Sequence, residues 1–139
     1  MMLTLEQPFV SHLAVRIADI NYGNHLGHDR LISLLHQARV EALAAIGASE
    51  LDFFGTALIL ARLETDYRAQ AFLHDTLDIA VWLGEMRASR FVLHYRVSRR
   101  DSDRETLIAE AQTVMVCFDY QRQRSTAVPD MFRENYRHE

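Results

Sequence analysis

Residues 15–47 read VRIADINYGNHLGHDRLISLLHQARVEALAAIG, and this stretch decides the fold. A short apolar run leads into a polar loop, Asp19–Asp29, which carries two asparagines, two glycines and two histidines. The loop opens a long apolar segment that ends at Gly47 and has the spacing of a helix. The first N–H groups of a helix have no intrahelical partner, and the helix dipole is positive at that end. The junction of loop and helix is therefore a candidate place to hold a carbonyl oxygen that becomes negative.

The predicted helix covers residues 29–46, with Asp29 as its N-cap and Gly47 as the C′ residue. Its apolar side chains form one broad stripe, made of Leu31, Leu34, Leu35, Ala38, Ala42, Ala45 and Ile46. A stripe of this width indicates a helix that buries one face against another layer of structure.

Five strands are expected beside this helix, at Phe9–Ile17, Ala57–Tyr67, Thr76–Met86, Ser89–Arg99 and Leu107–Tyr120. Apolar residues alternate along three of them, which is typical of strands with one buried face. The order predicts one α+β domain, residues 1–139, in which an antiparallel sheet of about five strands wraps round one long central helix. Such a sheet has edges, and pairing the edges of two subunits predicts a homodimer or homotetramer.

Composition argues against several other classes of protein. The net charge of −4 makes nucleic acid an unsuitable main partner, because phosphate binding needs a basic surface. The single cysteine, Cys117, excludes a disulfide framework within one chain, and we expect a buried thiol in a reducing, cytoplasmic protein. No apolar run reaches the roughly eighteen residues of a membrane span, and we expect no signal peptide. The histidines and acids lack the spacing of a metal site, so neither metal nor cofactor is expected.

The loop and the segments around it resemble a known family. RIADINYGNHLGHDRL, residues 16–31, is similar to the loop–helix signature of hotdog-fold acyl-CoA thioesterases of the 4-hydroxybenzoyl-CoA thioesterase type. The segments Ala38–Glu41, Ala61–Arg68 and Arg122–Pro129 fall where that family has similar sequences. The resemblance covers nearly the whole chain. It implies the hotdog fold and hydrolysis of an acyl-CoA thioester, with coenzyme A entering only as part of the substrate.

The chain departs from this family at the position of its catalytic aspartate, which is Asn21 here. An asparagine cannot be a general base at neutral pH, although it can orient a water or donate to an oxyanion. Asn21 is therefore either a residue that positions water or carbonyl, or a turn residue that bonds to the backbone. The family's next glycine is Asn24, for which we expect a tight turn in the left-handed region. Asp19 and Arg16 are expected to brace the loop as a pair.

Other residues are assigned candidate roles by the same resemblance. His25 is either the general acid or base, or a histidine whose ring braces the loop. The amide that polarises the thioester carbonyl falls at His28, and Gly27 would allow the backbone to approach the substrate closely. Two carboxylates could supply the missing base: Glu41, if partial burial raises its pKa, or Glu64, if a partner subunit donates it. The alternative for both is an ordinary ion pair with an arginine.

Arg90, Arg122 and Arg124 occupy positions similar to those that hold the nucleotide phosphates of coenzyme A in this family, although surface arginines often serve only solubility.

The sequence thus predicts a thioester hydrolase that acts on a fatty or aromatic acyl-CoA. Two alternatives stay open. One is a non-catalytic protein that binds acyl thioesters, because Asn21 replaces the usual acid. The other is a hotdog hydratase, for which His25 is the support.

Overall fold

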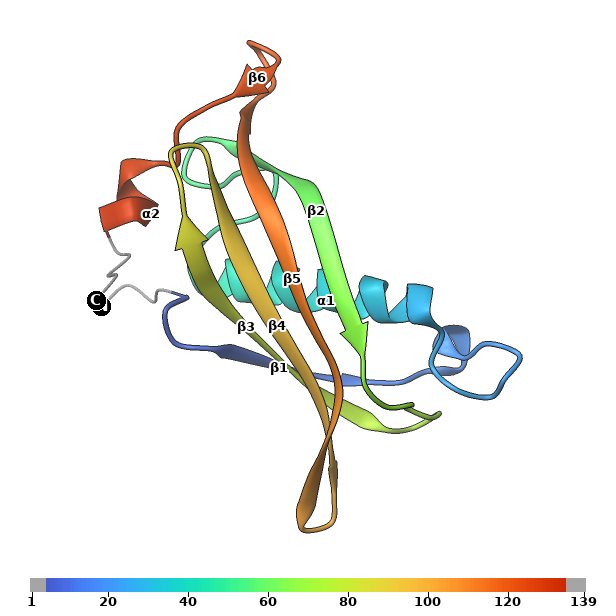
Figure 1. The fold of residues 1–139 in the computed structure, drawn as a ribbon. Coiled ribbons are helices and arrows are strands. Elements are labelled where there is room, and N and C mark those ends of the chain that lie inside the picture. Colours follow the sequence, from blue (N-terminus) through green and yellow to red (C-terminus); the bar gives the residue numbers. More distant parts are fainter. Residues whose placement is uncertain (1–4, 135–139) are drawn as a thin grey trace.

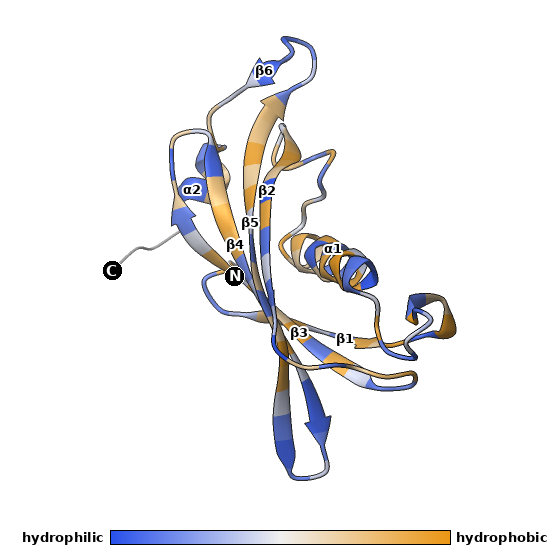
Figure 2. Cartoon of the chain, turned by 45° about the vertical axis from the view of Figure 1, so that its right-hand side comes forward, coloured by the Kyte–Doolittle hydropathy of each residue, from blue (hydrophilic) through white to orange (hydrophobic). Residues whose placement is uncertain are grey.

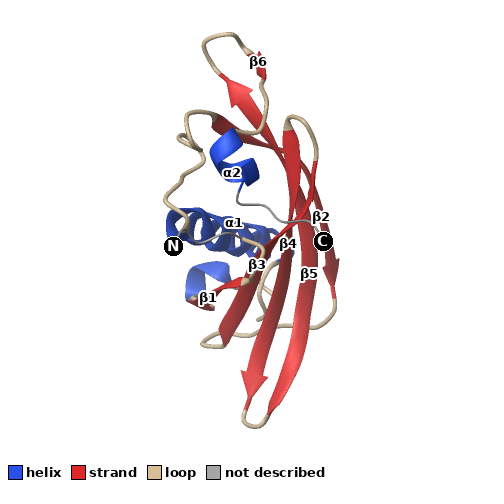
Figure 3. Cartoon of the chain, turned by 90° about the vertical axis from the view of Figure 1, so that its left-hand side faces the viewer, coloured by secondary structure: helices blue, strands red, loops and turns tan. Residues whose placement is uncertain are grey.

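The computed structural model describes residues 5–134, which form one sheet with two helices on the same face of it (Figure 1, Figure 3). The elements are β1 Phe9–Ala14, the 3-10 helix η1 Ile17–Asp19, α1 His28–Ala45, β2 Ala57–Tyr67, β3 Thr76–Met86, β4 Arg90–Asp101, β5 Arg104–Asp119, β6 Arg124–Ser125 and α2 Asp130–Glu134. Every strand pair is antiparallel, in the order β1-β3-β4-β5-β2, and β6 pairs with β5. The α+β fold class predicted from the sequence is confirmed. No helix of the described part is long and apolar enough to cross a membrane.

The core lies between α1 and the sheet. Alternate residues of β3, β4 and β5 point toward the helix and are buried, and Figure 2 shows the resulting orange bands along these strands. The helix buries the predicted stripe, including Leu31, Leu35 and Ala38. Burying each large apolar side chain contributes about 1.5–3 kcal/mol. The helix is therefore held by packing along one face.

A buried arginine also joins α1 to the sheet. The guanidinium of Arg39 donates to the hydroxyl of Tyr95 at 3.2 Å and lies 3.6 Å from the carboxylate of Glu50. The Tyr95 hydroxyl lies 2.7 Å from that of Thr113 on the next strand. A buried charge is tolerated only where such partners surround it. These contacts therefore fix α1 relative to β4 and β5.

The start of the chain differs from the sequence-based expectation in two places. β1 ends at Ala14 rather than at Ile17, because the backbone amide of Arg16 bonds to the Asp19 carboxylate and a turn of η1 follows. The N-cap of α1 is Gly27, and Asp29 is the second residue inside the helix, where the dipole favours its charge. Gly47, at φ 79°, is the expected C′ residue.

Cys117 lies on the inner face of β5 and is fully buried. Burial raises the pKa of its thiol to about 11, although Thr56 and Arg133 act in the opposite direction. Because reactivity requires the thiolate, we expect no reaction of the folded protein with an aromatic disulfide reagent at mildly alkaline pH. After unfolding in guanidinium chloride, one equivalent of thiol should react for each chain. Rapid labelling of the folded protein would contradict this placement.

Candidate active site

The loop between η1 and α1 forms one wall of a pocket of about 210 Å³. The pocket is lined by Asn21, His25, Leu26, Gly27, His28, Leu31, Tyr67, Ala69, Gln70, Ala71 and Ile108. The structure thus brings together Asn21, His25, Gly27 and His28, all from the predicted loop. The pocket is smaller than the roughly 300–1,000 Å³ of a site that encloses a whole small molecule. In one chain it has room for the end of a longer ligand.

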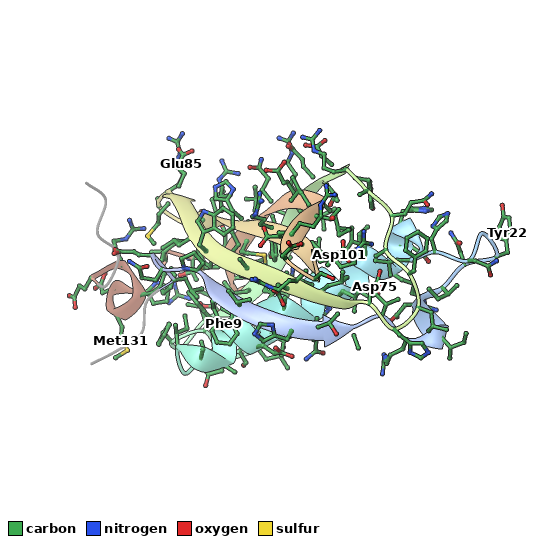
Figure 4. All side chains as sticks on the ribbon, turned by 90° about the horizontal axis from the view of Figure 1, so that it is seen from below. Phe9, Tyr22, Asp75, Glu85, Asp101 and Met131 are labelled. Carbon is green, nitrogen blue, oxygen red and sulfur yellow. The ribbon has the colours of Figure 1, made fainter. Side chains whose placement is uncertain are left out.

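Backbone hydrogen bonds hold the loop in a fixed shape. Asn24 donates to the carbonyl of Asn21 at 3.0 Å, and its φ of 65° confirms the predicted left-handed turn. Gly27 donates to the carbonyl of Asp19 at 3.0 Å. The Arg16 guanidinium lies 3.9 Å from the buried Asp19 carboxylate, which confirms the expected brace. Only the tip projects, and Figure 4 shows the Tyr22 side chain there, directed away from the rest of the molecule.

Asn21 makes the turn contact that the sequence allowed as one of its two roles. Its Oδ1 accepts a hydrogen bond from the backbone N–H of Gly23 at 2.9 Å. Because an N–H needs an acceptor, this contact identifies which side-chain atom is the oxygen. The Nδ2 group of Asn21, a residue that lines the pocket, remains available as a donor. The turn contact and a positioning role are therefore compatible.

His25 makes the loop-bracing contact that the sequence allowed as one of its two roles. Its Nδ1 lies 3.2 Å from the carbonyl oxygen of Leu26. A carbonyl can only accept, so Nδ1 carries the proton in this contact and the lone pair of the neutral ring is on Nε2. A Cβ built on Gly23 would lie 3.0 Å from His25 Nε2 and 3.3 Å from Asn21 Oδ1. His25 Nε2 and the side-chain oxygen of Asn21 therefore both lie beside Gly23.

The start of α1 supplies the donors of the site. His28 is the first helical residue, and its backbone N–H donates to no acceptor among the described residues. Gly27 is buried beside the Asp29 carboxylate, and a Cβ there would lie 2.8 Å from Oδ1 of Asp29. A free amide at the positive end of a helix attracts an oxygen that gains negative charge. The geometry of Gly27 and His28 thus suits the carbonyl-binding role expected for them.

The opposite wall of the pocket was not predicted. Tyr67, at the end of β2, donates from its hydroxyl to the carbonyl of His28 at 2.9 Å. The rings of the two residues pack edge to face, with their centroids 6.5 Å apart. Burial, and then the charge of Asp29, raise the pKa of Tyr67, so its hydroxyl stays protonated. The partners are 39 positions apart in the chain. No local pattern could have revealed the contact.

Arg99 holds the segment that completes this wall. Its guanidinium donates to the backbone carbonyl of Gln70 at 2.8 Å, to Asp75 at 3.1 Å and to both oxygens of Asp101 at 3.0 Å. Figure 4 shows Asp75 and Asp101 close together at this point. Arg99, followed by Thr106, lowers the pKa of the Asp101 carboxyl. At neutral pH the ion pairs of Arg99 with Asp75 and Asp101 therefore stabilise residues 69–71, which line the pocket.

The two candidate carboxylates lie outside the pocket of their own chain. Glu41 accepts from Gln37 at 2.9 Å rather than pairing with an arginine. The expectation of a raised Glu41 pKa is wrong, because Ser11 and Gln37 lower it and outweigh burial. Glu64 pairs with Arg62 and lines a separate pocket of about 190 Å³ on the outer face of the sheet. Neither acid reaches Asn21 or His25 within one chain.

The three candidate phosphate-binding arginines gather at the far end of the sheet. Arg90 starts β4 and borders a pocket of about 450 Å³ together with Arg62 and Arg87. Arg122 lies in the β5–β6 turn, 3.8 Å from Asp119, and Arg124 pairs with Asp119 in the sheet register.

No group of His, Cys, Asp or Glu in the described chain is arranged to hold a metal ion.

The chain belongs to the thioesterase-like superfamily, whose family model matches residues 15–136. A 1,4-dihydroxy-2-naphthoyl-CoA hydrolase from Synechococcus elongatus is 25% identical over 124 residues, which cover 86% of this chain and 88% of that protein. The acyl-CoA thioester hydrolase YbgC from Escherichia coli O6:H1 is 26% identical over 113 residues, which cover 80% and 82% of the two chains.

Solved structures establish the fold independently. Slr0204, a 1,4-dihydroxy-2-naphthoyl-CoA thioesterase from Synechocystis, aligns with a TM-score of 0.81 at 23% identity, over 91% of this chain and 93% of that one. The 4-hydroxybenzoyl-CoA thioesterase of Pseudomonas sp. strain CBS-3 aligns with a TM-score of 0.80 at 18% identity, over 91% and 97%. The protein has the hotdog fold of these thioesterases, as the sequence predicted.

Proposed function

We propose that this protein is a thioester hydrolase that cleaves a fatty or aromatic acyl-CoA to the free acid and coenzyme A. The observation that carries the proposal is the pocket at the start of α1. Asn21, His25 and His28 all line this pocket; His28 carries the first unbonded N–H of the helix, and the free Nε2 of His25 lies near the Asn21 amide beside Gly23. The names and activities of the relatives in the same superfamily support this reading.

The reaction follows from what each group can donate or accept. The thioester carbonyl accepts from the His28 N–H, and the apolar side of the pocket at Leu31 and Ile108 receives the acyl group. His25 Nε2 takes a proton from a water that Asn21 Nδ2 orients, and the water oxygen bonds to the carbonyl carbon. The tetrahedral intermediate then expels the thiolate, which takes the proton back from His25. A thiol of pKa about 8.5 leaves without a strong acid.

The proposal includes a homodimer formed through β2. β2 ends the strand order and has eleven residues, whereas the other edge, β1, has only six; each edge exposes one apolar side chain to 42%, Leu60 on β2 and Val10 on β1. A long unpaired edge with an exposed apolar side chain invites pairing with another strand. A two-fold axis beside β2 would pair this strand with its own copy.

Such a dimer would also complete the substrate site. The end of β2, at Tyr67, contacts His28, while its start pairs with the end of β5, next to the turn with Arg122 and to Arg124 on β6. At about 3.3 Å per residue, these two ends lie roughly 30 Å apart in one chain. Antiparallel pairing of two β2 strands brings the end of one strand to the start of the other. The thioester loop of one subunit would then face the arginines of its partner.

Thiol release from a panel of acyl-CoAs tests the function directly. The panel runs from acetyl to palmitoyl and includes benzoyl and phenylacetyl thioesters. We expect turnover of at least one member by the wild-type protein. Absence of release by the folded protein across the panel would favour the non-catalytic binder. Loss of enoyl-CoA absorbance without thiol release would favour the hydratase.

Asn21→Asp is expected to lower kcat about tenfold or more. The carboxylate keeps the acceptor for the Gly23 N–H but removes the Nδ2 donor and places negative charge beside the developing oxyanion. Asn24→Asp is the matched control, because it adds the same charge to the loop at an exposed turn position. A gain in kcat with Asn21→Asp alone would contradict the proposal and show that Asn21 stands in the place of a lost base.

A further inference from the structure

We propose that Tyr67 is a positioning residue of this site: its hydroxyl sets the direction of the backbone donors at the start of α1. This inference rests on the proposed thioesterase activity and assigns a part of the oxyanion-binding site to a strand remote from the loop. Tyr67 lines the same pocket as His25 and donates to the carbonyl oxygen of His28 at 2.9 Å.

The contact acts on a peptide unit rather than on a side chain. The His28 carbonyl and the Asp29 N–H belong to one planar trans peptide, so they point in opposite directions. Holding the carbonyl oxygen from the β2 side therefore fixes where the Asp29 N–H points. The His28 N–H belongs to the preceding peptide unit, whose Gly27 carbonyl accepts from the Leu31 N–H at 3.0 Å, so the Tyr67 bond bears on it only through the position of the His28 backbone. Both amides are in the first turn, where no intrahelical acceptor restrains them.

Three further features support this role. The rings of Tyr67 and His28 also pack edge to face, with an angle of 83° between their planes, so the tyrosine makes a second contact with the same residue. Among the described residues, no other hydrogen bond joins α1 to β2. The raised pKa of Tyr67 keeps the hydroxyl a donor throughout the range in which a thioesterase is assayed. The first turn of α1 therefore depends on Tyr67 for its attachment to β2.

Tyr67→Phe tests the inference because it keeps the ring and removes only the donor. We expect kcat for thiol release to fall about tenfold while KM changes less than about twofold, as for an interaction that matters in the transition state. Hydrogen exchange should also become faster at residues 31–34, where the first bonded amides of α1 lie, starting with that of Leu31 to Gly27.

Tyr95→Phe is the matched control. The substitution removes the hydrogen bonds of the Tyr95 hydroxyl with Arg39 and Thr113 in the core. Tyr95 is 1% exposed, whereas Tyr67 is 49% exposed at the pocket. We expect Tyr95→Phe to lower the melting temperature but to leave kcat of the folded enzyme unchanged. Unchanged kcat in Tyr67→Phe, or an equal fall in both variants, would overturn the inference.

The proposed function can fail separately. If the wild-type protein releases no thiol from any acyl-CoA, the thioesterase proposal fails, and hydrogen exchange then decides the role of Tyr67. Faster exchange at residues 31–34 in Tyr67→Phe, but not in Tyr95→Phe, would still support the attachment. Identical exchange in both variants would overturn it.

Discussion

Replacing His25 with alanine is expected to lower kcat for thiol release at least about 100-fold, the smaller end of what a general base contributes. The reason is the tautomer that the loop imposes. The Leu26 carbonyl holds the proton on Nδ1, so the neutral ring presents its Nε2 lone pair beside Asn21. Alanine removes this base and leaves the His28 amide in place. Steady-state kinetics on the best substrate of the panel measure the effect.

His12→Ala is the control for this substitution. His12 lies on β1 in an exposed pair with Asp78 at 2.7 Å, away from the pocket. We expect it to keep wild-type kcat. Circular dichroism and the melting temperature establish that both variants are folded. A His25→Ala enzyme with kcat within about threefold of the wild type would show that the ring only braces the loop, because a base that takes part in the reaction contributes far more.

A mixed dimer should restore activity that two inactive parents lack. One parent carries His25→Ala, and the other carries Arg122→Ala with Arg124→Ala. In the heterodimer, the intact loop of the second chain faces the intact arginines of the first. We expect about half of the wild-type kcat/KM at low substrate concentration, since one of the two equivalent sites is complete. Co-expression with two different affinity tags isolates the heterodimer.

The matched control pairs two defects in the same loop. A heterodimer of His25→Ala with Asn21→Ala leaves each site with one damaged loop, so no restoration is expected. Activity of the first heterodimer no greater than that of this control would contradict a site shared between subunits. In that case the arginines and the loop of one chain would have to act together across the length of β2.

Sequence reasoning succeeded where the signal is local. The bounds of β2 and β3 agree with the alternation of the sequence, and Asn24 adopts the left-handed turn expected of an asparagine at that position. The loop motif also predicted Asn21, His25, Gly27 and His28 as neighbours, and the structure brings them into one pocket. These features depend on residues within a few positions of one another.

The errors and omissions concern partners that are distant in sequence. A base role for Glu41 depended on a pKa raised by burial, but the pKa is lowered, and Ser11, on β1, is the first cause. Tyr67 was overlooked because its partner, His28, is separated from it by the whole of α1 and β2. For His25 the sequence offered two exclusive roles, whereas in the structure the bracing contact uses only Nδ1 and leaves Nε2 for the proposed role as a base. Only the folded chain shows which atoms face which.

A crystal structure with a non-hydrolysable analogue, in which a methylene group replaces the thioester sulfur of an acyl-CoA, tests the central claim most directly. We expect the ketone oxygen to lie about 2.7–3.2 Å from the backbone nitrogen of His28, within hydrogen-bond range. The acyl group should lie against Leu31 and Ile108. An analogue whose carbonyl group binds away from the start of α1, such as in the pocket on the outer face of the sheet, would contradict the proposed carbonyl-binding role of His28.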